Sequence, residues 1–255
     1  MCITDFYRPL KAGGLKLALG FACGLATVLS TSSCREDRDA VLPPGPEAAG
    51  REYYPLAVGR FWEYDVEEHY YNYDRDSTVR FQFRERVDTV FLGATGETTY
   101  RIVRARRVDS LGTWRDDSVM AVVLTPELVR RTVATVPSIE LLFPVREGKT
   151  WNPNLFNDRD STVRAYAQVG AARTLPGGRR FERTLRVVDE SLISDVQRRE
   201  HEATYAWDIG CVYRHRRLLD YCNTPQVTEG RCQLGSGYIV RGFTREEQLR
   251  AWGPR

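Results

Sequence analysis

Six cysteines and three histidines are the residues of this 255-residue chain whose chemistry best suits metal binding or nucleophilic attack. Structural zinc sites usually draw ligands from close Cys-x-x-Cys or His-x-x-x-His pairs, and neither spacing occurs here. The residues that could be gathered into such a site are His201, Cys211, His215, Cys222 and Cys232. Because no close pair exists among them, we predict no metal site and no cofactor.

Nucleophilic catalysis requires a nucleophile within hydrogen-bond reach of a base. The chain has no Gly-x-Ser-x-Gly elbow. Cys211 and His215 could form a thiolate pair, but four residues of strand place them on one face about 13 Å apart. No pattern distinguishes a carboxylate pair for glycoside hydrolysis. We therefore predict no catalytic residue and expect a protein that is not an enzyme.

Two of the late cysteines are spaced for a disulfide. Cys222 and Cys232 flank the turn-rich loop NTPQVTEGR, and a bond between them would staple a hairpin. Such bonds persist outside the cytoplasm. Cys211 lies in the middle of an expected strand and is predicted to be a buried thiol.

The N-terminus reads as an export signal over residues 1–33. Three cations (Arg8, Lys11 and Lys16) precede the apolar stretch LALGFACGLATVL, which is too short for a comfortable membrane span. The small residues STSS then lead to Cys34, an arrangement that resembles the lipobox of bacterial lipoproteins, with Thr31 where Leu is usual. The resemblance implies acylation of Cys34 and a membrane anchor. The alternative is an ordinary secreted protein with Cys34 as a free thiol.

Residues 34–52 read as a flexible tether, because charges in REDRD are followed by PPGP and small residues. Acidic residues after a lipidated cysteine resemble the signal that sends Bacteroidota lipoproteins to the outer face of the outer membrane. A solvated linker is the alternative. We expect an outer-membrane protein, lipid-anchored and facing the periplasm or the cell surface.

Charge argues against nucleic acid as a partner. The chain carries +3 and the signal +2, which leaves about +1 after processing. Arginine doublets are interleaved with acids at 106–107, 130–131, 179–180, 198–199 and 216–217. They read as solvated strand faces rather than as one basic patch.

Apolar residues beyond position 54 mostly recur with a period of two, which predicts half-buried strands. The expected strands are 79–88, 99–108, 117–124, 179–191, 203–221 and 236–243, with glycine-rich turns between most of them. Thr244 and Glu247 have capping-box spacing, which predicts a short C-terminal helix over 244–252. For residues 125–131 the sequence pattern does not distinguish a helix from a strand. We predict one all-β domain over 53–255, as an antiparallel curved sheet, an open barrel or a sandwich.

Two phrases occur twice in the same order: YPLAVGRFW with FPVREGKTW, and DRDSTVR at 74–80 and 158–164. In the first phrase Tyr54, Pro55, Gly59 and Trp62 match Phe143, Pro144, Gly148 and Trp151. Proline, glycine and tryptophan at these positions indicate a strand entry with a tight turn and a packing anchor. The repeat suggests an internal duplication of 54–80 and 143–164, or two equivalent corners of one sheet. The aspartates of DRDSTVR are too few for a calcium loop.

The opening YPLAVGRFWEY and the late YAWDIGCVY resemble Bacteroidota lipoproteins of unassigned function, over most of residues 52–243. The resemblance implies an antiparallel β fold and no catalytic residues. We expect a noncatalytic binding or assembly module of the cell envelope, with the membrane and an envelope protein or a small apolar ligand as partners. The alternative is a carrier that holds an apolar ligand or acyl chain in a β-sheet cavity.

Overall fold

The computed structural model describes residues 49–73, 75–223 and 232–254. The predicted signal peptide, Cys34 and residues 34–48 of the predicted tether lie outside the described residues. A search of the described part for a helix long and apolar enough to cross a membrane finds none.

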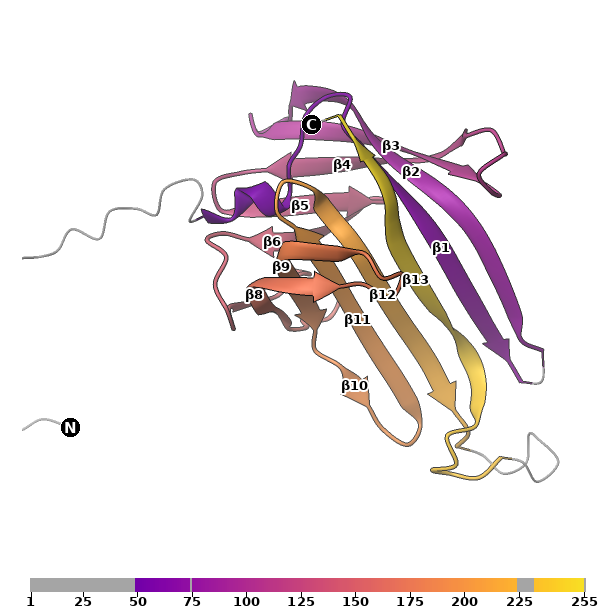
Figure 1. The fold of residues 1–255 in the computed structure, drawn as a ribbon. Helices are drawn as coiled ribbons and strands as arrows, with labels where there is room; N and C mark the ends of the chain where they lie inside the picture. The colour runs from indigo at the N-terminus through magenta and orange to yellow at the C-terminus, as the bar shows by residue number, and fades with distance from the viewer. Residues whose placement is uncertain (1–48, 74, 224–231, 255) are drawn as a thin grey trace, which may run out of the picture. The chain divides into compact units, whose positions relative to one another are not determined.

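The described residues form one antiparallel sheet (Figure 1). A 3₁₀ helix, η1 (Arg51–Tyr53), precedes β1 (Phe61–Asn72), β2 (Ser77–Leu92), β3 (Thr98–Arg107), β4 (Arg115–Leu124), β5 (Leu128–Val133), β6 (Val136–Leu142), β7 (Thr150–Trp151), β8 (Arg164–Thr174), β9 (Arg180–Asp189), β10 (Leu192–Ile193), β11 (Gln197–Ala206), β12 (Gly210–Tyr221) and β13 (Ile239–Gly253). The order is β6-β5-β4-β3-β2-β1-β13-β12-β11-β9-β8-β7, with β10 beside β11. The predicted all-β class is confirmed.

The predicted C-terminal helix is wrong, because residues 244–252 belong to β13. This strand pairs with β1 along one side and with β12 along the other. A helix of nine residues is marginal by itself, whereas both edges of β13 gain ladder hydrogen bonds. Long-range pairing therefore overrides the capping-box spacing of Thr244 and Glu247.

The expected single strand 203–221 is a hairpin of β11 and β12. Asp208 has a φ of 57° and Gly210 a φ of 103°, values that turn the chain in the left-handed region. Residues 125–131, for which both helix and strand were expected alternatives, form a turn that leads into β5. The turn between β5 and β6 contains Ala134 and Thr135, whose φ angles are 46° and 69°.

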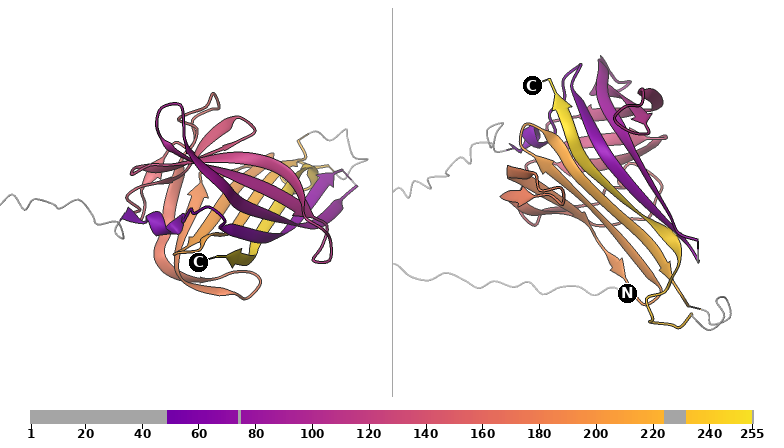
Figure 2. Two further views of the ribbon diagram at one scale, coloured as in Figure 1. Left: turned by 90° about the horizontal axis from the view of Figure 1, so that it is seen from above. Right: turned by 45° about the vertical axis from the view of Figure 1, so that its right-hand side comes forward.

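The two ends of the strand order, β6 and β7, meet mainly through side chains. The Ile139 amide on β6 donates to the Pro153 carbonyl at 2.9 Å, and Trp151 Nε1 on β7 donates to the Ile139 carbonyl at 3.1 Å. Tyr166 Oη on β8 donates to the Leu142 carbonyl at 3.0 Å and accepts from the Leu142 amide at 2.7 Å. These contacts close the sheet into a nearly complete barrel, seen from above in Figure 2.

The glycines of the repeated phrase make matching turns. Gly59 and Gly148 have φ of 88° and 73°. The Gly59 amide donates to the Val87 carbonyl of β2 at 2.8 Å, and the Gly148 amide donates to the Tyr166 carbonyl of β8 at 3.1 Å. Each glycine thus starts a hairpin in the same way, as the sequence match suggested.

The aromatic residues of the phrase also correspond. Tyr54 and Phe143 are buried, and so are Trp62 and Trp151. Each indole donates to a backbone carbonyl of a distant segment, Trp62 to Ile209 at 2.5 Å and Trp151 to Ile139 at 3.1 Å. The two prolines differ in their surroundings. Pro55 lines the core beside Trp62. Pro144 follows a cis peptide bond, and its carbonyl accepts a hydrogen bond from Lys149 Nζ at 3.1 Å.

The second repeated phrase, DRDSTVR, occupies different environments in its two copies. In the first, Ser77–Arg80 opens β2, and the exposed Arg80 pairs with Glu67 at 2.7 Å. In the second, residues 158–163 precede β8, and the buried Arg164 holds Asp189 at 2.5 Å. The predicted internal duplication stays a prediction.

The predicted disulfide between Cys222 and Cys232 is present, with the Cα atoms 5.4 Å apart. Both cysteines are buried. The Cys222 amide donates to the Tyr238 carbonyl at 2.9 Å. The bond therefore ties the end of β12 to the segment that leads into β13.

We predict that Tyr166→Phe weakens the closure between β6 and β8. The change removes the hydroxyl that serves both backbone groups of Leu142, and buried unsatisfied groups cost about 1–3 kcal/mol. Urea unfolding should show this loss of free energy. The control is Tyr100→Phe, since the Tyr100 hydroxyl has no hydrogen bond to the described residues, and its unfolding should change by about 0.5 kcal/mol or less. Equal effects would contradict the assignment.

Candidate functional site

The inward face of the sheet changes from aromatic to charged along each strand. On β1 the alternating inward residues are Trp62, Tyr64 and Val66, followed by Glu68 and Tyr70. The same order recurs on β12 (Cys211, Arg214, Arg216) and β13 (Leu249, Glu247, Arg245). The interior therefore has an aromatic core at one end and a charged lining at the other.

A buried carboxylate marks the boundary between the two ends. Glu85 Oε1 on β2 lies 2.5 Å from Arg131 Nη2 on β5 and 2.6 Å from Arg104 Nη2 on β3. Arg214 on β12 is 4.0 Å from the same oxygen and pairs with Glu247 on β13 at 3.0 Å. The side chains of Glu85 and Arg131 are 5% and 6% exposed. These five residues form a continuous ionic layer across the interior.

The surroundings of Glu85 keep its charge. Burial alone would raise the pKa of this carboxyl, because it penalises the charged form. The guanidinium groups of Arg131, Arg104 and Arg214 overcome that effect and hold the pKa of Glu85 well below its ordinary 4.5. Glu85 is therefore ionised in the folded protein at neutral pH.

A second charged group lies at the closure of the barrel. Arg164 makes two bonds to Asp189, at 2.5 and 3.0 Å, and Arg164 Nη1 donates to the Ile139 carbonyl of β6 at 2.9 Å. Asp189 also lies 3.1 Å from His201 Nδ1. Burial would raise the pKa of Asp189, but the hydrogen bonds from His201 and Arg164 lower it overall.

Beyond these groups the interior opens into two adjoining hollows of about 690 and 400 Å³, which share His201 and Arg216. We call them together the inner cleft. Their charged lining residues are Arg104, Arg131, Arg159, Arg164, Arg199, Arg214, Arg216 and Arg245, with Glu68, Glu140, Asp189, Glu190, Glu200 and Glu247. The combined volume is in the range of small-molecule sites, and the lining is mostly charged.

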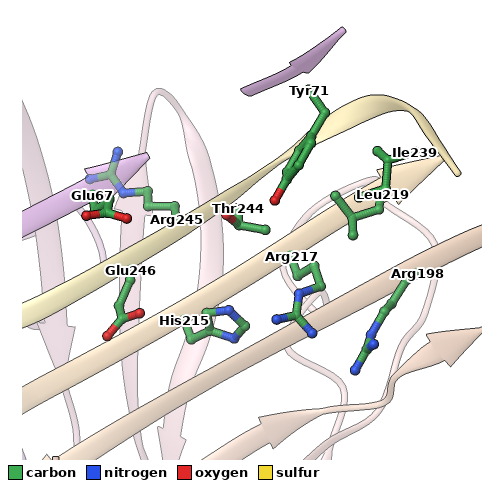
Figure 3. A pocket seen from close by; sticks show the side chains of 10 residues that line it. All are labelled: Glu67, Tyr71, Arg198, His215, Arg217, Leu219, Ile239, Thr244, Arg245 and Glu246. Carbon is green, nitrogen blue, oxygen red and sulfur yellow. The ribbon is translucent and has the colours of Figure 1, made fainter. Parts of the chain in front are cut away.

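A separate groove of about 400 Å³ lies on the outward face (Figure 3). His215 lies there between Glu246 and Arg217, and Arg198 follows on the neighbouring strand. Arg217 and Arg198 both donate to Glu200, at 2.9 and 2.8 Å. Burial and the charge of Arg217 lower the pKa of His215. Arg217 and Arg198 of this outer groove thus already share an acceptor within the protein.

Cys211 and His215 do not face one another. A register shift opposite Tyr205 adds one residue to β12, so that Cys211 and Arg214 share the inward face and His215 points outward. The predicted placement of both residues on one face is therefore wrong. Burial raises the pKa of the Cys211 thiol to about 12, which leaves it protonated and a poor nucleophile.

Within the residues that the structure describes, no group of three His, Cys, Asp or Glu side chains could hold a metal ion. Among the predicted site residues, the repeated phrases serve the core and the closure, and Cys222 and Cys232 form the disulfide. Of these, only Arg159, Thr162 and Arg164 of the second DRDSTVR copy line the inner cleft.

Sequence reading missed the arginines of the inner cleft. The doublets were expected on solvated faces, yet Arg131, Arg199 and Arg216 line the interior, while Arg198 and Arg217 line the outer groove. Adjacent residues of a strand point to opposite faces. A doublet inside a strand must therefore send one guanidinium inward, which is the signal that could have found these residues.

We predict that Glu85→Gln lowers the free energy of unfolding by about 3–5 kcal/mol, because it leaves buried arginines without their counter-charge. The matched control is Glu67→Gln. Glu67 pairs with Arg80 in solvent, and the control should cost about 1 kcal/mol or less. Urea denaturation at neutral pH measures both.

Acid should affect the same interaction. The pKa of Glu85 in the folded protein lies below the ordinary 4.5 that it has in the unfolded chain. The ionised carboxylate therefore contributes its full share to the free energy of unfolding above pH 4.5, and this share is lost as the pH falls below 4.5. The unfolding free energy of the parent protein should fall below pH 4.5, and Glu85→Gln should show a shallower slope. An identical slope in both proteins would contradict this account.

Comparison with known proteins finds distant likenesses of fold. No family model and no curated protein matches the chain. A protein described as exported, with a YmcC-like fold, from Bacteroides fragilis aligns over 79% of this chain and 98% of its own, at 11% identity and a TM-score of 0.40. A protein described as a lipoprotein from Parabacteroides distasonis aligns over 78% and 98%, at 11% identity and a TM-score of 0.36.

Proposed function

We propose that the protein is a lipid-anchored, noncatalytic binding module of the cell envelope. The observation that carries the binding role is the inner cleft, whose two hollows of about 690 and 400 Å³ open from a barrel with a filled core. The anchor rests on the apolar segment 17–29 followed by STSSC. The acidic residues after Cys34 support the outer membrane as the location.

The chemistry of the interior supports binding rather than catalysis. The Cys211 thiol is buried and its pKa is raised to about 12. His201 is engaged by Asp189, which also holds Arg164. A nucleophile would need a base within hydrogen-bond reach. Asp189 orients His201 as such a base would be oriented, but within the described residues no thiol or hydroxyl is hydrogen-bonded to that imidazole.

The geometry favours this module over a carrier of an apolar ligand. The space among the core residues Tyr54, Trp62, Tyr64 and Ile102 is about 20 Å³, which is enough for about one water molecule. The larger hollows are lined by guanidinium and carboxylate groups. An acyl chain there would leave these charges without water, at high cost.

We predict that Cys34→Ala releases the protein from the membrane. The full-length variant should move from the detergent phase to the aqueous phase in Triton X-114 partitioning, because the acylated residue is gone. Cys23→Ala is the control, since Cys23 leaves with the signal peptide and its loss should not change partitioning. A Cys34→Ala protein that stays in the detergent phase would contradict the anchor.

Native mass spectrometry of the protein extracted from its own envelope should detect either no cargo or a polar cargo. Extra mass that leaves on denaturation identifies a ligand directly. A fatty acid or phospholipid released in stoichiometric amount would contradict the polar binding module and support the carrier.

A further inference from the structure

We propose that the inner cleft binds an oxyanion, carboxylate or phosphate, through the guanidinium group of Arg216. This rests on the proposed binding role and names its ligand class. Arg216 lines both hollows of the cleft and is solvent-exposed there. Among the described residues it has no hydrogen-bond or ion-pair partner, and its guanidinium lies 5.6 Å from the ring centre of Phe243.

Five other arginines of the inner cleft already have counter-charges. Arg214 pairs with Glu247 at 3.0 Å, and Arg245 pairs with Glu68 at 2.5 Å. Arg164 holds Asp189 through two bonds. Arg104 and Arg131 share Glu85. Arg216 therefore differs from these arginines in keeping its donors available to a ligand.

The carboxylates of the cleft are committed in the same way. Glu68 also accepts from Tyr70 Oη at 2.7 Å, and Glu247 also accepts from Arg245 at 2.6 Å. Asp189 is shared by Arg164 and His201. Glu140 accepts from Tyr205 Oη at 3.1 Å. Of the described carboxylates lining the cleft, these four cannot approach Arg216 without leaving a present partner.

The balance of charge favours an anion. Eight arginines and six carboxylates line the cleft among the described residues. One of the six, Glu200, turns its carboxylate to Arg217 and Arg198 of the outer groove, so that with Glu85 beneath the cleft six carboxylates face eight arginines. Partial burial, followed by the charges of Arg159 and Arg245, lowers the pKa of Arg216, and Asp189 opposes this only in part. An anion beside Arg216 would relieve repulsion among three cations.

The geometry of the group also indicates an oxyanion. A guanidinium presents paired N–H donors that match the two oxygens of a carboxylate or phosphate. Phe243 and Tyr70, whose rings are 6.2 Å apart, lie on one side of the cleft. They offer an apolar surface to the organic part of such a ligand.

The test is isothermal titration calorimetry of the full-length protein in detergent at low ionic strength, with inorganic phosphate and with citrate. We expect saturable binding of at least one anion. Arg216→Gln should weaken it at least tenfold, and Arg216→Lys should retain part of it. The arm that binds more tightly identifies phosphate or carboxylate as the preferred group.

The matched control is Arg217→Gln, which removes the neighbouring charge from the outward face and should change the affinity less than twofold. Equal urea midpoints of the two variants would establish that both fold. No saturable binding of either anion, or equal losses in both variants, would overturn the proposal. If neither anion binds but native mass spectrometry finds another polar cargo, the oxyanion site fails and the binding module stands.

Discussion

The charge of Glu85 is the constraint on which the interior depends. Removing a carboxylate from water costs several kcal/mol unless cations and hydrogen bonds replace the solvent. Arg131 and Arg104 supply these at 2.5 and 2.6 Å, and Arg214 lies 4.0 Å away. Because Arg131 comes from β5 and Arg214 from β12, the layer joins strands that are far apart in the sheet order. The arginines that neutralise Glu85 therefore hold opposite walls of the barrel in place relative to each other.

The ionic layer also determines where the barrel can be hollow. On its aromatic side, side chains such as Tyr64 and Tyr205 fill the interior. On its other side, charged groups need water or counter-ions, so the strands cannot close over an apolar filling. Apolar residues in place of a buried ion pair are often equally stable. The charged layer is therefore better explained by the open cleft above it than by stability.

The all-β class and the strands β2, β3, β4, β9, β11 and β12 were predictable from the alternation of apolar residues and from the glycine turns, whereas β1 and β8 were not among the expected strands. The C-terminal strand was not, because the spacing of Thr244 and Glu247 is local, whereas β13 is set by pairing with β1, far away in the sequence. The inner cleft was missed for a related reason. An arginine doublet inside a strand shows that one of the two arginines faces inward. In β12 the β-bulge determines which of the two it is. A β-bulge depends on tertiary pairing, which no local sequence pattern specifies.

The doublet Arg216–Arg217 shows why the inner and outer faces of one strand differ in function. Both side chains project from neighbouring positions of β12. Outside, Glu200 accepts from Arg217 at 2.9 Å and also from Arg198, so that the outer charges form a closed set. Inside, the nearby carboxylates are held by other cations, and Arg216 is left with donors but no acceptor among the described residues. On the outer face the protein itself supplies the carboxylate that accepts from the arginine. On the inner face a bound ligand would supply the acceptor for Arg216.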